Sequence, residues 1–228
     1  QRDRAQRVTQ FLIDAFAAAN PGGEMGKNVT AREILERGAK QLETDLTDQP
    51  ELKAQLLGTI AQAQLALSLV DEAQDTAARM VTFINDPSLR DLRFQFNEIQ
   101  ARIHLSGRDV VAAGPFIDWL GDTAISLDEQ IVHADLYTNF LNGQGAQSEL
   151  ISFVELFLSE NPTQLSLLHN LDGYYRVRMR QASILVLQGK IESGLEILLS
   201  LKESMQSRRP KDLAVMLDLN RRLSSAYR

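Results

Sequence analysis

Apolar residues recur along this chain at spacings of three, four and seven, the spacings that place side chains on one face of a helix. Residues 54–87 show the pattern most regularly, in two stripes separated by a polar turn at residues 68–71. The stripe residues are Leu57, Ile60, Ala61, Ala73, Ala77 and Met80. Because small side chains let two helices approach closely, the segment predicts an antiparallel helix pair.

The same arrangement returns three more times. Turns are predicted at residues 106–109, 142–145 and 188–190, and apolar stripes at helical spacing flank each of them. One further helix is predicted near the end of the chain, with an apolar side formed by Leu213, Met216, Leu217, Leu223 and Tyr227. Since no turn and partner helix follow it, we expect an incomplete last repeat and an array that continues in a longer parent protein.

The first 29 residues predict a separate element. Residues 1–20 predict one amphipathic helix with an apolar stripe from Val8 to Phe16, and a Pro-Gly-Gly run ends that helix because these residues continue it poorly. A loop follows. Thr30 then stands three residues before Glu33, the spacing of a capping box that begins a helix. The expected organisation is an amphipathic helix and loop over residues 1–29 and helical repeats over residues 30–228.

The 34-residue length of the segment at residues 54–87 resembles that of the tetratricopeptide repeat, a helix-turn-helix unit. The resemblance implies an all-α fold of antiparallel helix pairs stacked into a right-handed superhelical solenoid. The first helix of each pair would line the concave side, where such arrays hold peptides. Ser68 and Gly107 stand at matching turns but are 39 residues apart, so the array is less regular than its first full repeat.

Composition narrows the classes of function. Hydrophobic residues make up 44% of the 228 positions, and the formal net charge is −6. A nucleic-acid-binding protein would carry a basic stripe, so we expect no nucleic-acid partner. The chain has no cysteine, which excludes disulfides, thiolate catalysis and cysteine zinc sites. No apolar run approaches the ~18 residues of a membrane span, so we expect none in this chain.

Metal and catalytic sites are not expected either. His104, His133 and His169 lie in separate segments without an HExxH pattern, whereas a structural zinc site needs about four converging ligands. Carboxylates such as those of residues 71–72 and 128–129 sit at helix starts, where they favour the helix dipole. The sequence therefore predicts no enzyme activity, metal or cofactor. A polar pocket with converging ionisable side chains would favour the alternative, an enzyme.

The strongest candidate binding segment is residues 174–180, which gathers two tyrosines and three arginines. Both residue types are favoured at binding hot spots. Arg176 and Arg180 are one helical turn apart and share a face, so together they could clamp an acidic peptide. The competing interpretation is a solvated basic helix start whose arginines pair with nearby acids.

Three further residues are predicted to face the concave groove from first helices: Gln62, Asn97 and His104. With Tyr175, Arg176 and Arg180 they form the predicted partner-binding set. We expect a protein or peptide partner on this groove, and a homodimer is an alternative.

Residues 4–80 carry a more specific resemblance. The runs RAQRVTQFLIDAFAAANP, TAREILERGAKQLETDL and LSLVDEA resemble the tetratricopeptide region that follows the catalytic domain of bacterial Hanks-type serine/threonine protein kinases. The resemblance implies a non-catalytic protein-interaction or ligand-sensing module in the C-terminal region of such a kinase. In that family a membrane helix commonly precedes this region, which would place the chain on the periplasmic side of an inner-membrane parent, and otherwise in the cytoplasm.

The phosphate loop, catalytic loop and DFG triplet of a kinase are all missing from this sequence, so any kinase activity would belong to the parent. The alternative parent is a transcriptional regulator or another signalling protein, such as a sensor with a nucleotide cyclase.

Overall fold

The computed structural model describes residues 30–226, apart from 47–48, 85, 161–170, 209 and 211. The regular structure in these residues is entirely helical, which confirms the all-α prediction for this part of the chain. The amphipathic helix predicted for residues 1–20 lies outside the described residues. The chain divides into two compact units, Gln1–Gly107 and Arg108–Arg228.

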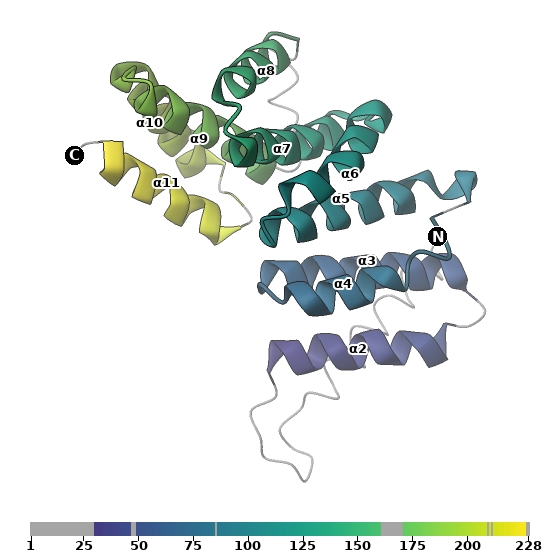
Figure 1. The fold of residues 1–228 in the computed structure, drawn as a ribbon. Helices are drawn as coiled ribbons and strands as arrows, with labels where there is room; N and C mark the ends of the chain where they lie inside the picture. The colour runs from purple at the N-terminus through teal and green to yellow at the C-terminus, as the bar shows by residue number, and fades with distance from the viewer. Residues whose placement is uncertain are drawn as a thin grey trace. The chain divides into compact units, whose positions relative to one another are not determined.

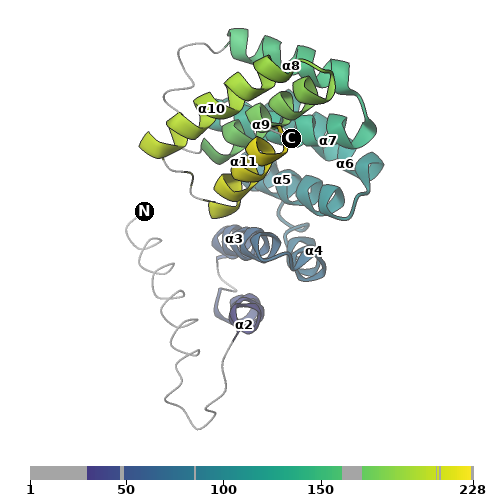
Figure 2. The same ribbon diagram turned by 90° about the vertical axis from the view of Figure 1, so that its left-hand side faces the viewer.

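Unit 1 contains helices that pack in sequence order. They are α2 (Ala31–Asp45), α3 (Pro50–Ala66), α4 (Val70–Ala78) and α5 (Arg90–Ser106), with the short 3-10 helix η1 (Pro87–Leu89) before α5. Helix α3 packs against α2, α4 and α5, and α4 also packs against α5. Figure 2 shows α2, α3 and α4 nearly end-on, so their axes run nearly parallel or antiparallel. The predicted inward residues Leu57, Ala61, Ala73, Ala77 and Met80 are all fully buried.

Unit 2 repeats one packing scheme. Its helices are α6 (Val110–Thr123), α7 (Leu127–Gln144), α8 (Gln147–Glu160), α9 (Leu171–Leu187), α10 (Ile191–Ser207) and α11 (Leu213–Ala226). Helix α7 packs against α8 and α9, and α8 also packs against α9; α9, α10 and α11 repeat this relation (Figure 1). Helices α7 and α9 thus each contact both the helix that follows them and the next odd-numbered helix.

Local sequence explains where several helices begin and end. The Thr30 hydroxyl accepts a hydrogen bond from the Glu33 backbone N–H at 3.2 Å, and the Glu33 carboxylate accepts one from the Thr30 N–H at 3.0 Å. This confirms the predicted capping box. Ser126 and Glu129 form the same reciprocal pair at the start of α7. Helix α7 is ended by Gly145 at a φ of 74°, a left-handed conformation that costs glycine little.

Two turns use the left-handed conformation without glycine. Ser68 and Arg108 both have a φ of 61°, whereas Gly107, the predicted counterpart of Ser68, has a φ of −75°. The matching positions of the two turns are therefore Ser68 and Arg108. A non-glycine residue in this region costs about 1–2 kcal/mol, because its Cβ approaches the following carbonyl oxygen.

Two sequence predictions need correction. The helix predicted over residues 72–84 ends at Ala78, after which Met80 and Phe83 donate to carbonyls three residues back, in tighter turns. In α11 the buried stripe is only partly the predicted one. Leu223 is buried as predicted, but Leu213 and Leu217 are each 71% exposed, and Val215 and Leu219 face the core instead.

Candidate functional site

The predicted site residues of unit 1 lie on α3 and α5. The half-buried Gln62 of α3 donates to Glu98 of α5 at 3.4 Å and accepts from Gln95 of the same helix at 3.5 Å. Asn97 is 8% exposed, and its amide donates to the carbonyl of Arg93 one turn back. Asn97 therefore presents little surface, whereas Gln62 links the two helices.

His104 lies half-buried in the last turn of α5. None of the hydrogen bonds above joins it to Gln62 or Asn97. The structure thus places the three residues on neighbouring helices without gathering their polar groups around one point.

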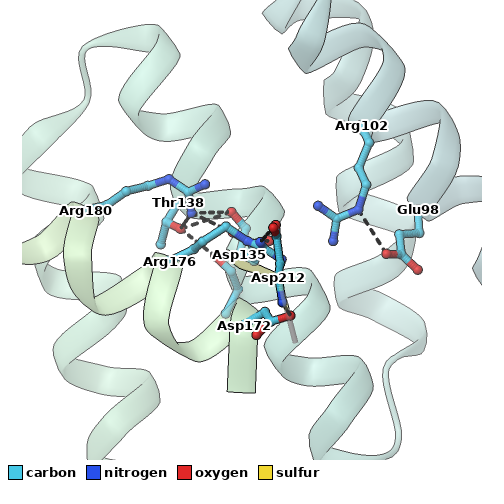
Figure 3. A network of polar contacts seen from close by, with 9 residues as sticks. Glu98, Arg102, Asp135, Thr138, Asp172, Arg176, Arg180 and Asp212 are labelled. Carbon is cyan, nitrogen blue, oxygen red and sulfur yellow. Dashed lines mark hydrogen bonds and ion pairs between the residues drawn. The ribbon is translucent and has the colours of Figure 1, made fainter. Parts of the chain in front are cut away.

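The predicted arginines Arg176 and Arg180 of unit 2 are bound to carboxylates of their own chain (Figure 3). Asp135 of α7 is 2% exposed and accepts from Arg176 at 3.1 Å and from Arg180 at 2.7 Å, both on α9. Arg180 also donates to the Asp135 carbonyl at 2.9 Å and to the Thr138 hydroxyl at 3.0 Å. Arg176 reaches Asp212 at 3.4 Å. These contacts join α7, α9 and the segment before α11.

This network favours the competing interpretation of residues 174–180, in which the arginines pair with acids of the chain. Only 27% of the Arg176 side chain and 15% of the Arg180 side chain are exposed. An acidic peptide would have to displace the buried Asp135, which would leave that carboxylate without its counter-charges at a cost of several kcal/mol.

Tyr175 serves the core rather than a surface. Its side chain is fully buried, and its phenol oxygen lies 3.2 Å from the Ser204 hydroxyl and donates to the Arg208 carbonyl at 2.9 Å. A buried phenol with both contacts made is a structural residue. Tyr175 therefore offers no surface to a partner, contrary to its place in the predicted set.

A second arginine bridge, on α11, repeats the contact that Arg180 makes from α9. Arg222 of α11 donates to the Met179 carbonyl at 3.3 Å and to the Ser183 hydroxyl, and it pairs with Asp218 at 2.7 Å. Arg180 and Arg222 thus each bind a backbone carbonyl and a hydroxyl on the preceding odd-numbered helix.

In unit 1, Arg102 pairs with Glu98, the partner of Gln62, at 3.0 Å (Figure 3).

Aromatic residues gather on the side of α7 that faces α6 and α8. His133 stacks on Tyr137 with ring centroids 5.5 Å apart, and Tyr137 meets Phe153 of α8 edge-on at 4.8 Å. A Cβ on Gly121 of α6 would come within 2.8 Å of His133 Nε2, so the missing side chain makes room for the imidazole. Tyr137 donates to Glu149 of α8 at 2.9 Å.

Carboxylates surround these rings. Burial lowers the pKa of His133, while the charges of Asp118 and Asp122 oppose that shift. Burial also raises the pKa of Tyr137, with further contributions from Glu149 and Asp118. Among the described residues, neither Asp118 nor Asp122 forms a salt bridge with a lysine or arginine. We call the six residues the acidic aromatic face: Asp118, Asp122, His133, Tyr137, Glu149 and Phe153.

Sequence reasoning missed this face, although a signal for it exists. Residues 109–175 contain ten Asp or Glu and no Lys or Arg, whereas residues 176–228 contain eleven Lys or Arg and five Asp or Glu. The net charge of the whole chain conceals this separation. Helices α6, α7 and α8 lie entirely within the acidic segment.

Other site types are not found in the part of the chain that the structure describes. That part has no group of three or more His, Asp or Glu placed to hold a metal ion. None of its helices has the length and apolar character needed to cross a membrane.

A groove between α10 and α11 is lined by Lys202, Met205, Gln206, Met216, Leu219 and Asn220.

Comparisons with known proteins identify no family. No family model matches the chain, and no curated protein and no solved structure is significantly similar to it.

Proposed function

We propose that this chain is a non-catalytic protein-interaction module, built as a tetratricopeptide-like solenoid of antiparallel helix pairs. The observation that carries the proposal is the repeated contact scheme of unit 2, in which α7, α8 and α9 pack as α9, α10 and α11 do. Arrays of this kind expose one continuous surface from successive first helices, and their common use is peptide or protein binding.

The arginine bridges support the first-helix surface as the docking site. Arg180 and Arg222 fix the spacing of α7, α9 and α11, so side chains between them are held on a rigid base. A preorganised surface loses less entropy when a partner binds. In this proposal Arg176 and Arg180 position the surface, while half-buried neighbours such as Asn139, one helical turn beyond Asp135, contact the partner.

Site-specific photo-crosslinking tests this proposal. A photoreactive phenylalanine analogue at Asn139 of α7 should crosslink one protein partner in extracts of the native cell, and the partner should then bind the purified chain. The matched control carries the analogue at Glu196 of α10, an exposed position on a second helix. Equal labelling from both positions, or no partner that binds after purification, would refute docking on the first helices.

The proposed parent is a bacterial serine/threonine kinase with this module in its C-terminal region, supported by the resemblance of residues 4–80. The parent gene should then encode a glycine-rich loop, a catalytic loop and a DFG triplet upstream of this segment. Reporter fusions to the full-length parent would test the periplasmic placement. A DNA-binding or nucleotide cyclase domain upstream would instead support the alternative parents, a transcriptional regulator or another sensor.

A further inference from the structure

The acidic aromatic face lies on a different side of α7 from the arginine network. His133 and Tyr137 contact α6 and α8, whereas Asp135 and Thr138 contact α9. Its binding properties therefore do not depend on the docking surface proposed for the first helices.

An apolar helix face continues this surface along α8. Glu149, Phe153 and Leu156 follow at positions i, i+4 and i+7, and such residues lie on one side of a helix. Leu156 is 57% exposed, and Phe153 is half-buried against Tyr137. Glu160 extends the same side by one more turn and is exposed. Aromatic and leucine side chains thus alternate here with carboxylates.

The charges around this face are one-sided. Asp118 and Asp122 on α6 and Glu155 and Glu160 on α8 are exposed, and none of them forms a salt bridge with a described residue. Helices α6, α7 and α8 contain no lysine or arginine that could compensate them. In contrast, Asp135 is neutralised by the two arginines of α9. The uncompensated carboxylates produce a negative potential over a partly apolar surface.

We propose that the acidic aromatic face, extended by Leu156, binds an amphipathic protein segment whose apolar side chains alternate with lysine or arginine at helical spacing. Apolar side chains of that segment pack on Phe153 and Leu156, in the manner of a helix laid on an apolar face. Its cations lie beside Asp118, Asp122 and Glu149. The exposed carboxylates and the exposed apolar side chain of Leu156 thus favour the same kind of partner.

The binding test uses the full chain and a labelled peptide of about 18 residues, long enough for about five helical turns. The peptide contains lysine, leucine and alanine, with the leucines on one side, and binding is followed by fluorescence anisotropy. The variant D118N/E149Q/D122N removes three charges and keeps an acceptor for the Tyr137 hydroxyl. Because each exposed charge pair contributes modestly to binding, the loss of three such pairs should lower the affinity about tenfold. Raising the NaCl concentration from about 50 to about 300 mM should weaken wild-type binding.

The matched control is E192Q/E196Q/E203Q, which removes three exposed charges from α10 of the same unit. Its affinity should stay within about twofold of wild type, because screening confines the effect of a charge to about one Debye length. L156S should weaken binding without changing the salt dependence. Circular dichroism checks that every variant is folded.

Three results would overturn the proposal. They are equal affinity losses in the two triple variants, equal binding of a scrambled peptide of the same composition, or no saturable binding by wild type. A wild-type dimer in sedimentation that D118N/E149Q/D122N dissociates would assign the face to a second copy of the chain instead. Because the crosslinking position Asn139 is outside this face, the two proposals can fail separately.

Discussion

Gly194 of α10 lies where this helix approaches α9 closely. A Cβ at this position would lie 2.8 Å from the Ala182 carbonyl oxygen and 2.5 Å from Cγ2 of Val186, both on α9. The Val186 side chain can rotate away, but the Ala182 oxygen belongs to the backbone of a helix. Replacing Gly194 with alanine must therefore push α10 away from α9, whose core contact includes Ala182, Met179 and Leu198.

The net effect of Gly194→Ala combines two opposing terms. Overpacking a well-packed core costs about 1–3 kcal/mol. Alanine is favoured over glycine in a helix interior by about 0.5–1 kcal/mol, which offsets part of that cost. We expect the unfolding free energy to fall by about 1–2 kcal/mol. For a protein of this size that corresponds to a melting temperature lower by about 2–8 °C.

Gly173→Ala is the matched control, because Gly173 is also a buried glycine inside a helix of unit 2 and no proline follows it. Its added Cβ would lie 3.4 Å from the Ile131 carbonyl oxygen and 3.5 Å from Ile131 Cγ1, which are ordinary van der Waals distances, so the helix preference should dominate. This variant should be as stable as wild type or more stable by about 0.5–1 kcal/mol. The double variant V186A/G194A removes one of the two close contacts and should recover only part of the loss.

Urea unfolding followed by the fluorescence of Trp119 measures these effects, since Trp119 is the single tryptophan and lies in unit 2. Circular dichroism monitors both units in the same samples. A Gly194→Ala variant as stable as Gly173→Ala would refute the reasoning, because it would show that the added Cβ of residue 194 causes no packing cost. Complete recovery in V186A/G194A would show that the Ala182 carbonyl imposes no constraint.

Three further outcomes are expected. Asp135→Asn should lower the unfolding free energy by about 2–3 kcal/mol, because two arginines lose a buried counter-charge, whereas Asp212→Asn should cost under about 1 kcal/mol. Equal costs for the two variants in urea unfolding would contradict the central role of Asp135 in the arginine network. Ser126→Ala should cost about 1 kcal/mol by removing the cap of α7, and an unchanged melting temperature would argue against the cap. Burial lowers the pKa of His133, so folding favours its neutral form. The contribution of His133 to stability should therefore be complete above pH about 6.5 and should fall as the pH decreases further. Urea unfolding of His133→Gln should show a weaker fall in stability at low pH, and a pH profile identical to that of wild type would contradict this assignment.

Helix positions follow from the sequence where local signals decide them. Thr30 and Glu33 predict the start of α2 correctly, because a capping box involves only groups within one turn. The inward positions Leu57 and Ala77 are also predicted correctly, since the spacing of small and apolar residues allows one buried stripe in each helix.

Local signals fail where two stripes compete. Helix α11 contains leucines on two sides, and spacing alone favoured the side of Leu213 and Leu217. Arg222 binds the Met179 carbonyl of α9, and α11 is turned so that Leu219 joins Leu223 in the core while Leu213 and Leu217 are exposed. The choice depends on an acceptor more than forty residues away, so periodicity could not reveal it.

The candidate site depended on tertiary contacts in the same way. Arg176 and Arg180 were correctly placed on one side of a helix, but the carboxylate that binds them lies on α7, and Asp135 carries no local sign of this role. Conversely, the absence of lysine and arginine from residues 109–175 is visible in the sequence. The structure shows why this absence matters, because α6, α7 and α8 carry exposed carboxylates around aromatic rings and supply no cation to pair with them.

The arginine bridges have a consequence for how such an array could diversify. Arg180 and Arg222 bind backbone carbonyls, those of Asp135 and Met179, and every residue type supplies a carbonyl at the same place in a helix. Substitution of Met179 thus removes packing but leaves the acceptor of Arg222 in position. An arginine bound to a backbone carbonyl thus helps to hold neighbouring helices in register while the side chain at the acceptor position is free to change during evolution.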